Sequence, residues 1–152
     1  MQTTITENLT PQQELEHLKN IYGENHHDRL YGILTDSFNV LQNRAQMLLS
    51  LITITLTITG FSGPSIAASG LLARISIAFG LVLVLLSALI LISGPLRLNW
   101  CTNWKSETID LSLIHLIEQR NFRTRRYHLA SIALVIGLIG YVSSVVTFLL
   151  TG

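Results

Sequence analysis

Polar residues, most of them with amide or hydroxyl side chains, recur with a final glycine every three or four residues along the first long apolar stretch of the chain and just before it. This polar stripe consists of Asp36, Asn39, Asn43, Gln46, Ser50, Thr53, Thr57 and Gly60. In an α-helix the seven-residue period of the stripe keeps all of its members on one side. Hydrocarbon offers no hydrogen-bond partner, so a polar face inside a bilayer must meet another helix or water.

Two interpretations of the polar stripe stay open. In the first, several copies of the chain place part of the stripe around one axis and form a pore or polar seam. The residues of this seam, called the seam residues below, are Asn43, Gln46, Ser50, Thr53 and Thr57. In the second, the members before the apolar stretch face the cytosol, and the others bond to further helices of the same protomer. No member inside the apolar stretch is charged, which argues against steep ion selectivity or a proton relay.

No other group of residues has the spacing of a catalytic or metal site. The chain shows no Ser–His–Asp set, no paired carboxylates in an apolar stretch and no Gly-rich phosphate loop, so we expect neither enzyme activity nor a cofactor. His26 and His27 lie near His17, Glu24 and Asp28 but lack an i, i+4 histidine pair or a cysteine partner. We therefore expect a solvent-exposed turn there and no metal.

Basic residues precede the last apolar stretch. Arg120, Arg123, Arg125 and Arg126 are positioned to attract anionic lipid head groups, at about 1 kcal/mol each. Arg74 stands alone at the start of the second apolar stretch, where it either reaches the membrane interface or pairs with an acidic partner subunit. A net charge of +1 argues against nucleic acid as a partner.

The elements that carry these residues are three apolar stretches, about 45–61, 75–93 and 127–150. Each reaches the roughly 17–25 residues that a membrane-spanning helix needs. Only 12% of the 152 residues are charged, against about 25% in soluble proteins, and apart from Arg74 they are confined to 1–44 and 97–126. The sequence therefore predicts an all-α integral membrane protein with three transmembrane helices.

The basic residues also predict the orientation of the chain. The connection 60–70 carries no charge, whereas the connection 94–126 carries six basic side chains. The positive-inside rule then places this second connection and the N-terminus in the cytoplasm and the C-terminus outside. Trp100 and Trp104 suit the interfacial aromatic belt. We expect a multi-pass protein of the inner (cytoplasmic) membrane.

Local signals predict where helices begin and end. Residues 1–10 are polar and expected to be disordered, and residues 11–44 to form cytoplasmic amphipathic helices that start at Pro11 with Thr10 as N-cap and break at Gly23. A second helix is expected from about Asp28 to Thr59. The segment 60–64, with two glycines and a proline, is expected to end it.

The end of the second span and the last helix are predicted from the residues after position 93. Gly94-Pro95 should close the second span, and a long helix should start near Ser106 or Thr108 and continue through the last span. The first and third spans are thus extended into the cytoplasm as a short helical stalk. Its expected contacts are Leu30, Leu34 and Phe38 against Ile109, Leu113, Leu116 and Ile117.

The segment 53–59 alternates threonine with apolar residues and on its own would be predicted as a strand. A lone strand cannot cross lipid with its backbone groups unpaired, whereas threonine hydroxyls in a helix can bond to the carbonyl four residues earlier. We therefore predict a helix.

Small residues share one face of each of the two later spans. These small-residue faces consist of Ala73, Gly80, Ser87 and Gly94, and of Ala130, Ala133, Gly137, Gly140, Ser144 and Thr147. Such faces let helix backbones approach closely, which is a main source of helix affinity in lipid. They predict helix packing, in a homo-oligomer or with other membrane subunits.

Two passages resemble the small bacterial multi-span membrane effectors of anti-phage systems, of the Pycsar and SLATT types. They are Gln42–Leu49 at the entry to the first span, and Leu113–Leu116 followed by Arg123–Tyr127 at the entry to the last. The chain departs from that group in carrying Asn43-Arg44 where an acidic residue and lysine are common. The resemblance implies an inner-membrane oligomer that impairs membrane integrity when triggered.

Two functions follow as expectations. The first is a self-associating inner-membrane protein that acts as a pore-forming or membrane-perturbing effector. The alternative is a non-catalytic accessory or scaffold subunit that docks onto a larger membrane complex through its small-residue faces.

Overall fold

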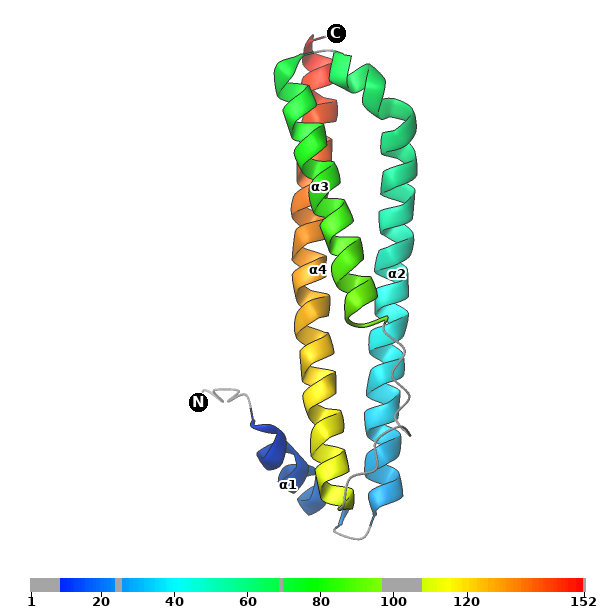
Figure 1. Cartoon of the computed structure of the whole chain (residues 1–152), viewed down its shortest axis with the longest axis vertical. Helices are drawn as coiled ribbons and strands as arrows, with labels where there is room; N and C mark the ends of the chain where they lie inside the picture. Colours follow the sequence, from blue (N-terminus) through cyan, green and yellow to red (C-terminus); the bar gives the residue numbers. More distant parts are fainter. Residues whose placement is uncertain (1–8, 24–25, 69, 97–107, 152) are drawn as a thin grey trace, which may run out of the picture. The chain divides into compact units, whose positions relative to one another are not determined.

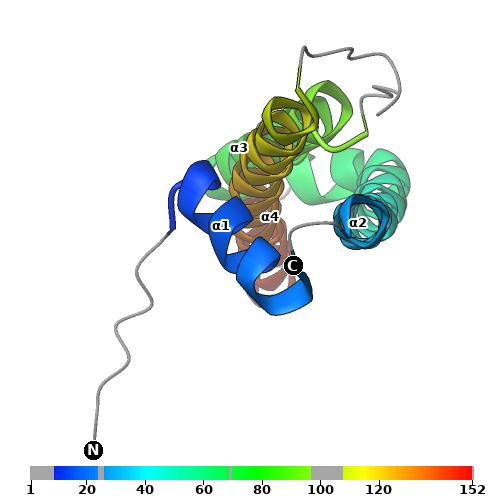
Figure 2. The same cartoon turned by 90° about the horizontal axis from the view of Figure 1, so that it is seen from below.

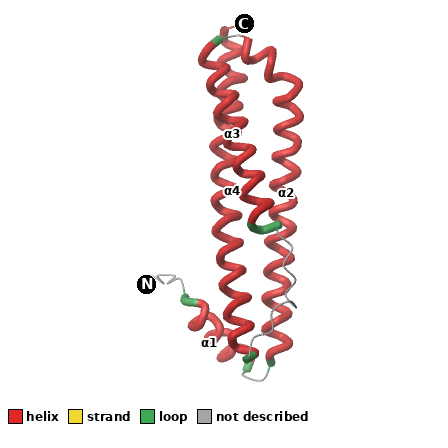
Figure 3. The backbone as a smooth tube through the Cα atoms, in the orientation of Figure 1, coloured by secondary structure: helices red, strands yellow, loops and turns green. Residues whose placement is uncertain are grey.

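The computed structural model describes residues 9–23, 26–68, 70–96 and 108–151, and all regular structure in these ranges is α-helical (Figures 1 and 3). The helices are α1 (Pro11–Tyr22), α2 (His27–Ala68), α3 (Leu71–Ser93) and α4 (Ile109–Thr151). Three of them, α2, α3 and α4, are long and apolar enough to cross a membrane. The all-α prediction with three candidate spans is confirmed. The predictions for residues 1–8, Trp100 and Trp104 lie outside the described residues.

Helix α1 begins and ends where its local sequence predicts. Thr10 and Gln13 form a reciprocal capping box: the Gln13 amide donates to Thr10 Oγ1 at 3.4 Å, and the Thr10 amide to Gln13 Oε1 at 2.9 Å. Pro11 fills the first helical position, where its missing N–H costs nothing. Gly23 ends the helix with φ +91°, a conformation that residues with a Cβ rarely adopt.

Helix α2 is longer than predicted. It continues through Pro64 to Ala68, so the expected end of the helix at 60–64 is wrong. A proline removes one backbone hydrogen bond and bends a helix without always stopping it, and the last part of α2 turns toward the start of α3 (Figure 1). Across 53–59 the helix prediction is confirmed, since Thr53, Thr55 and Thr57 each donate to the carbonyl four residues earlier at 2.9 Å.

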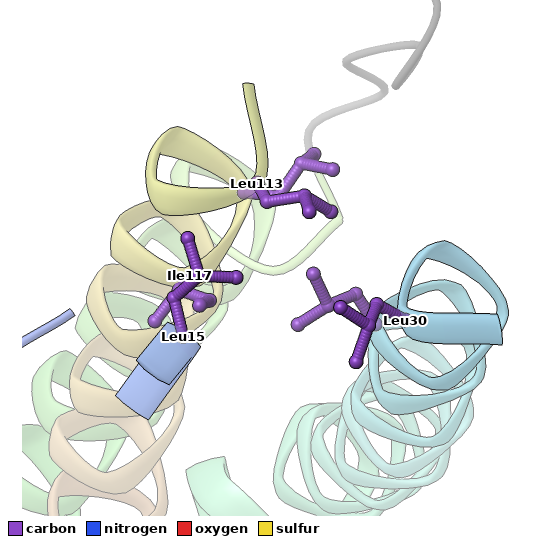
Figure 4. Packing of buried hydrophobic residues seen from close by; sticks show 6 residues of the cluster. Leu15, Leu30, Leu113 and Ile117 are labelled. Carbon is purple, nitrogen blue, oxygen red and sulfur yellow. The ribbon is translucent and has the colours of Figure 1, made fainter. Parts of the chain in front are cut away.

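The chain forms two compact units, to both of which α2 and α4 contribute. The first comprises Met1–Val40 and Leu98–Phe122. Its buried cluster joins Leu30 and Leu34 of α2 to three residues of α4, namely Leu113, Leu116 and Ile117 (Figure 4). This is the pairing that the sequence predicts for the stalk, with Phe38 packed against it and Ile109 left 59% exposed.

Helix α1 also belongs to this cluster, which the sequence did not predict. Its Leu15 is 5% exposed and lies beside Ile117 (Figure 4), and α1 lies obliquely against the first part of α4 (Figures 1 and 2). Two ion pairs flank this contact: Lys19 Nζ to Asp110 Oδ2 at 2.7 Å, and Arg120 Nη2 to Glu14 Oε1 at 2.7 Å. An apolar anchor between two ion pairs therefore fixes α1 on α4.

The second unit comprises Leu41–Arg97 and Arg123–Gly152. Its larger cluster takes two buried residues from each of three helices: Ala45 and Ile52 of α2, Val84 and Leu91 of α3, and Ala130 and Leu134 of α4. A smaller cluster lies around the α2–α3 connection and contains Ile66, Ala73 and Ile77. The predicted helix end at Gly94-Pro95 and the predicted start near Thr108 are both confirmed.

Candidate polar seam and helix-packing faces

The seam residues all lie on the exposed side of α2. Exposed side chains are found at all five positions, Asn43, Gln46, Ser50, Thr53 and Thr57, although α2 packs with α3 and α4 around the core of the second unit. The hydroxyl of Ser50 donates to the Gln46 carbonyl at 3.1 Å, and those of Thr53 and Thr57 donate within α2 in the same way. The interpretation that these three hydroxyls bond to other helices of the same protomer is therefore wrong.

Two other threonines of α2 face the core instead. Thr55 and Thr59 are 7% and 9% exposed and donate to the carbonyls of Leu51 and Thr55. Sequence reasoning grouped the hydroxyls only by the polar stripe and missed these two. Their spacing from Ile52, three and seven residues, is the signal that could have placed them on the buried face.

The outward surface of α2 is divided lengthwise. Beside the seam residues lies a strip of exposed apolar side chains, with Met47 72%, Ile54 57% and Phe61 84% exposed. An apolar strip suits contact with acyl chains, whereas hydroxyl and amide groups next to it have no partner in hydrocarbon. The apolar strip therefore favours lipid, whereas the seam residues favour another helix or water.

The small-residue faces of α3 and α4 meet each other inside the unit. A Cβ added to Gly80 would lie 2.8 Å from the Gly137 carbonyl oxygen and 3.1 Å from the Tyr141 nitrogen. A Cβ on Gly140 would lie 3.3 Å from the Gly80 Cα. The backbones of α3 and α4 thus approach so closely that only glycine fits at Gly80.

Hydrogen bonds and burial extend this contact along both helices. Ser87 is fully buried, and its hydroxyl donates across to the Ala130 carbonyl at 2.7 Å. Ser144 is also fully buried, and its hydroxyl donates to the Tyr141 carbonyl of its own helix at 2.7 Å. Ala133 is half-buried. Gly80, Ser87 and Gly137 thus lie in the contact between α3 and α4 within a single copy of the chain.

Arg120 and Arg126, both expected at lipid head groups, are engaged by protein groups. Arg120 Nη2 contacts both carboxylate oxygens of Glu14, at 2.7 and 2.8 Å. Arg126 Nη1 donates to the carbonyl and the hydroxyl of Ser93, at 3.1 and 3.2 Å. Ser93 is the last residue of α3, where carbonyls lack helix partners and carry partial negative charge, so the guanidinium stabilises that end.

The remaining two arginines differ in exposure. Arg125 is exposed and Arg123 half-buried. Head-group binding by this cluster stays a prediction. The pairs of Arg120 and Arg126 could not be predicted from the sequence, because Glu14 lies 106 residues and Ser93 lies 33 residues away along the chain.

The histidines form no recognisable centre. His115 lies 3.2 Å from the Gln119 side-chain nitrogen and 3.8 Å from Glu118, and His26 is exposed near the start of α2. In the described part of the chain, no three His, Cys, Asp or Glu side chains come together as a metal site. No protein-family model matches the chain, and neither a curated protein nor a solved structure shows significant similarity to it.

Proposed function

We propose that this chain is an integral membrane protein that self-associates through the seam residues and acts as a pore-forming or membrane-perturbing effector. In this proposal α2, α3 and α4 cross the inner membrane, with the N-terminus in the cytoplasm and the C-terminus outside. The observation that carries it is the exposure of Gln46, Ser50, Thr53 and Thr57 on the outward side of an apolar helix. The resemblance to the anti-phage membrane effectors implies the same kind of function.

The chemistry of the seam suggests what such an assembly would pass. The hydroxyl donors of Ser50, Thr53 and Thr57 are already satisfied by their own helix. Their oxygens still accept hydrogen bonds, and the Gln46 amide both donates and accepts. Facing each other across an axis, these groups can hold water without charge, which favours a weakly selective leak.

The alternative function, an accessory or scaffold subunit, has less support. It depends on small-residue faces that are free to dock onto other subunits. Gly80 and Gly137 are instead buried against each other, and Ser87 is buried against α4. The polar seam is then the face of the bundle that most needs a partner in lipid.

Cysteine cross-linking tests the self-association directly. On a Cys101→Ser background, Thr53→Cys should form disulfide-linked dimers in membranes under mild oxidation. The matched variant Ile54→Cys, on the neighbouring apolar strip and 57% exposed in the wild type, should form far fewer. Equal cross-linking at both positions, or cross-linking only at 54, would contradict the seam.

A leak assay in vesicles tests the function. The triple variant Ser50→Ala, Thr53→Val, Thr57→Val should reduce the release of a small trapped dye to the level of empty vesicles. A control with hydroxyls removed from α4, Ser143→Ala and Thr147→Val, should leave the leak unchanged. An undiminished leak in the triple variant would refute a pore lined by α2.

A further inference from the structure

An isolated charge lies beside a cavity at the α2–α3 connection. Arg74 is the only charged residue between positions 45 and 96, and it is exposed on the first turn of α3. It lines an open cavity of about 560 Å³ together with Pro64, Ala67, Ala68, Gly70 and Leu71. Small-molecule sites range over about 300–1,000 Å³, so the space suits a ligand fragment.

The unit that contains Arg74 has no acidic side chain. Neither Leu41–Arg97 nor Arg123–Gly152 contains an aspartate or a glutamate. Every charged side chain there is an arginine, namely Arg44, Arg74, Arg97, Arg123, Arg125 and Arg126. An exposed guanidinium at a membrane surface attracts anionic groups, at about 1 kcal/mol per basic residue. The counter-charge that binds Arg74 is therefore carried by no side chain of this unit.

The walls of the cavity indicate what carries that charge. Among the residues that the structure describes there, those other than Arg74 are glycine, proline, alanine and leucine, none of which offers a charged side chain. The neighbouring Leu71 and Leu72 are 73% and 74% exposed and extend the apolar surface. A guanidinium binds a phosphate through two parallel hydrogen bonds, and the apolar surface binds hydrocarbon. One molecule that presents both is a phospholipid.

We propose that this cavity binds the phosphate of an anionic phospholipid in the leaflet that meets the α2–α3 connection. The guanidinium of Arg74 holds the phosphate, and the glycerol and upper acyl chains lie on Ala67, Ala68 and Leu71. Free phosphate would use the charge alone and gain nothing from the apolar walls. This site goes beyond the proposed pore and requires only that the helices lie in a membrane.

Local fluorescence quenching tests the site on the full chain in vesicles. Leu72→Trp, with Trp100 and Trp104 changed to Phe, serves as the reporter beside the cavity. Dibrominated phosphatidylglycerol should bind there about fivefold more tightly than dibrominated phosphatidylcholine, the factor expected for one basic residue. Adding Arg74→Gln should bring the two lipids to equal affinity, and Arg74→Lys should keep part of the preference.

Two further variants separate a cavity from a general charge effect. Arg44→Gln, which removes one charge at the start of the α2 segment of the same unit, should leave the preference unchanged. Ala68→Leu, which fills the cavity and keeps the charge, should abolish it. Equal quenching by both lipids in the reporter protein, or a preference that survives Arg74→Gln or Ala68→Leu, would overturn the proposal. So would loss of the preference in excess inorganic phosphate at constant ionic strength, which would indicate a site for free phosphate.

Discussion

The close crossing of α3 and α4 gives the most quantitative prediction. In Gly80→Ala the new Cβ would lie 2.8 Å from the Gly137 carbonyl oxygen. An ordinary contact is about 3.5 Å, so the two helices must separate by roughly 0.7 Å at this point. The nearest atoms are backbone, hence no side-chain rotation relieves the contact.

The expected size of the effect follows from two opposing contributions. Overpacking of this kind costs about 1–3 kcal/mol. The better helix propensity of alanine returns about 1 kcal/mol, which leaves a net loss of about 0–2 kcal/mol. For a chain of this length, each kcal/mol lowers the unfolding midpoint by about 2–4 °C. Gly80→Ala should therefore lower the midpoint by up to about 8 °C.

A graded series of glycine variants provides the controls. Gly140→Ala, whose Cβ would lie 3.3 Å from the Gly80 Cα, should have a smaller effect. Gly60→Ala, with nothing within 4 Å, should not lower the midpoint. Thermal unfolding followed by circular dichroism in one detergent measures all three. A midpoint for Gly80→Ala at or above that of Gly60→Ala would refute the close crossing.

Two further predictions concern contacts between helices. Ser87→Ala should lower the free energy of unfolding by about 0.5–1.5 kcal/mol, because it removes the buried hydrogen bond to the Ala130 carbonyl. Ser143→Ala should change it little, because the Ser143 hydroxyl bonds within α4. Equal unfolding midpoints of the two variants would contradict this prediction. Glu14→Gln should loosen α1 and speed hydrogen exchange of its amides about fivefold, because Glu14 and Arg120 form a half-buried charged pair. The exchanged pair Glu14→Arg with Arg120→Glu should restore protection in part, and unchanged exchange in Glu14→Gln would show that the pair does not hold α1.

Most helix boundaries could be predicted from the sequence because they depend on residues within one turn. The capping pair of Thr10 and Gln13, the glycine at 23 and the Gly94-Pro95 step act locally, and the structure places helix ends at each of them. Pro64 was the exception. A proline favours the end of a helix, but α2 continues beyond Pro64, because Ile66 is buried in the cluster at the α2–α3 connection.

The direction in which each helical face points could not be predicted in the same way. The threonines of 53–59 are chemically alike, yet Thr55 and Thr59 are buried while Thr53 and Thr57 are exposed. The small-residue faces could equally have served another chain. Which face is buried depends on which helices dock, and that is decided by the summed packing of residues far apart in the sequence.

The sequence by itself determined that this chain is helical, where three apolar helices lie and which residues share a face, because 3.6-residue periodicity and capping are local properties. Only the tertiary structure decided that the backbones of α3 and α4 meet at Gly80 and Gly137, that α1 is held by Glu14 and Arg120, and that the seam residues face outward. These contacts join positions 57 and 106 residues apart. No local pattern specifies such pairs, since their free energy exists only once the helices are docked.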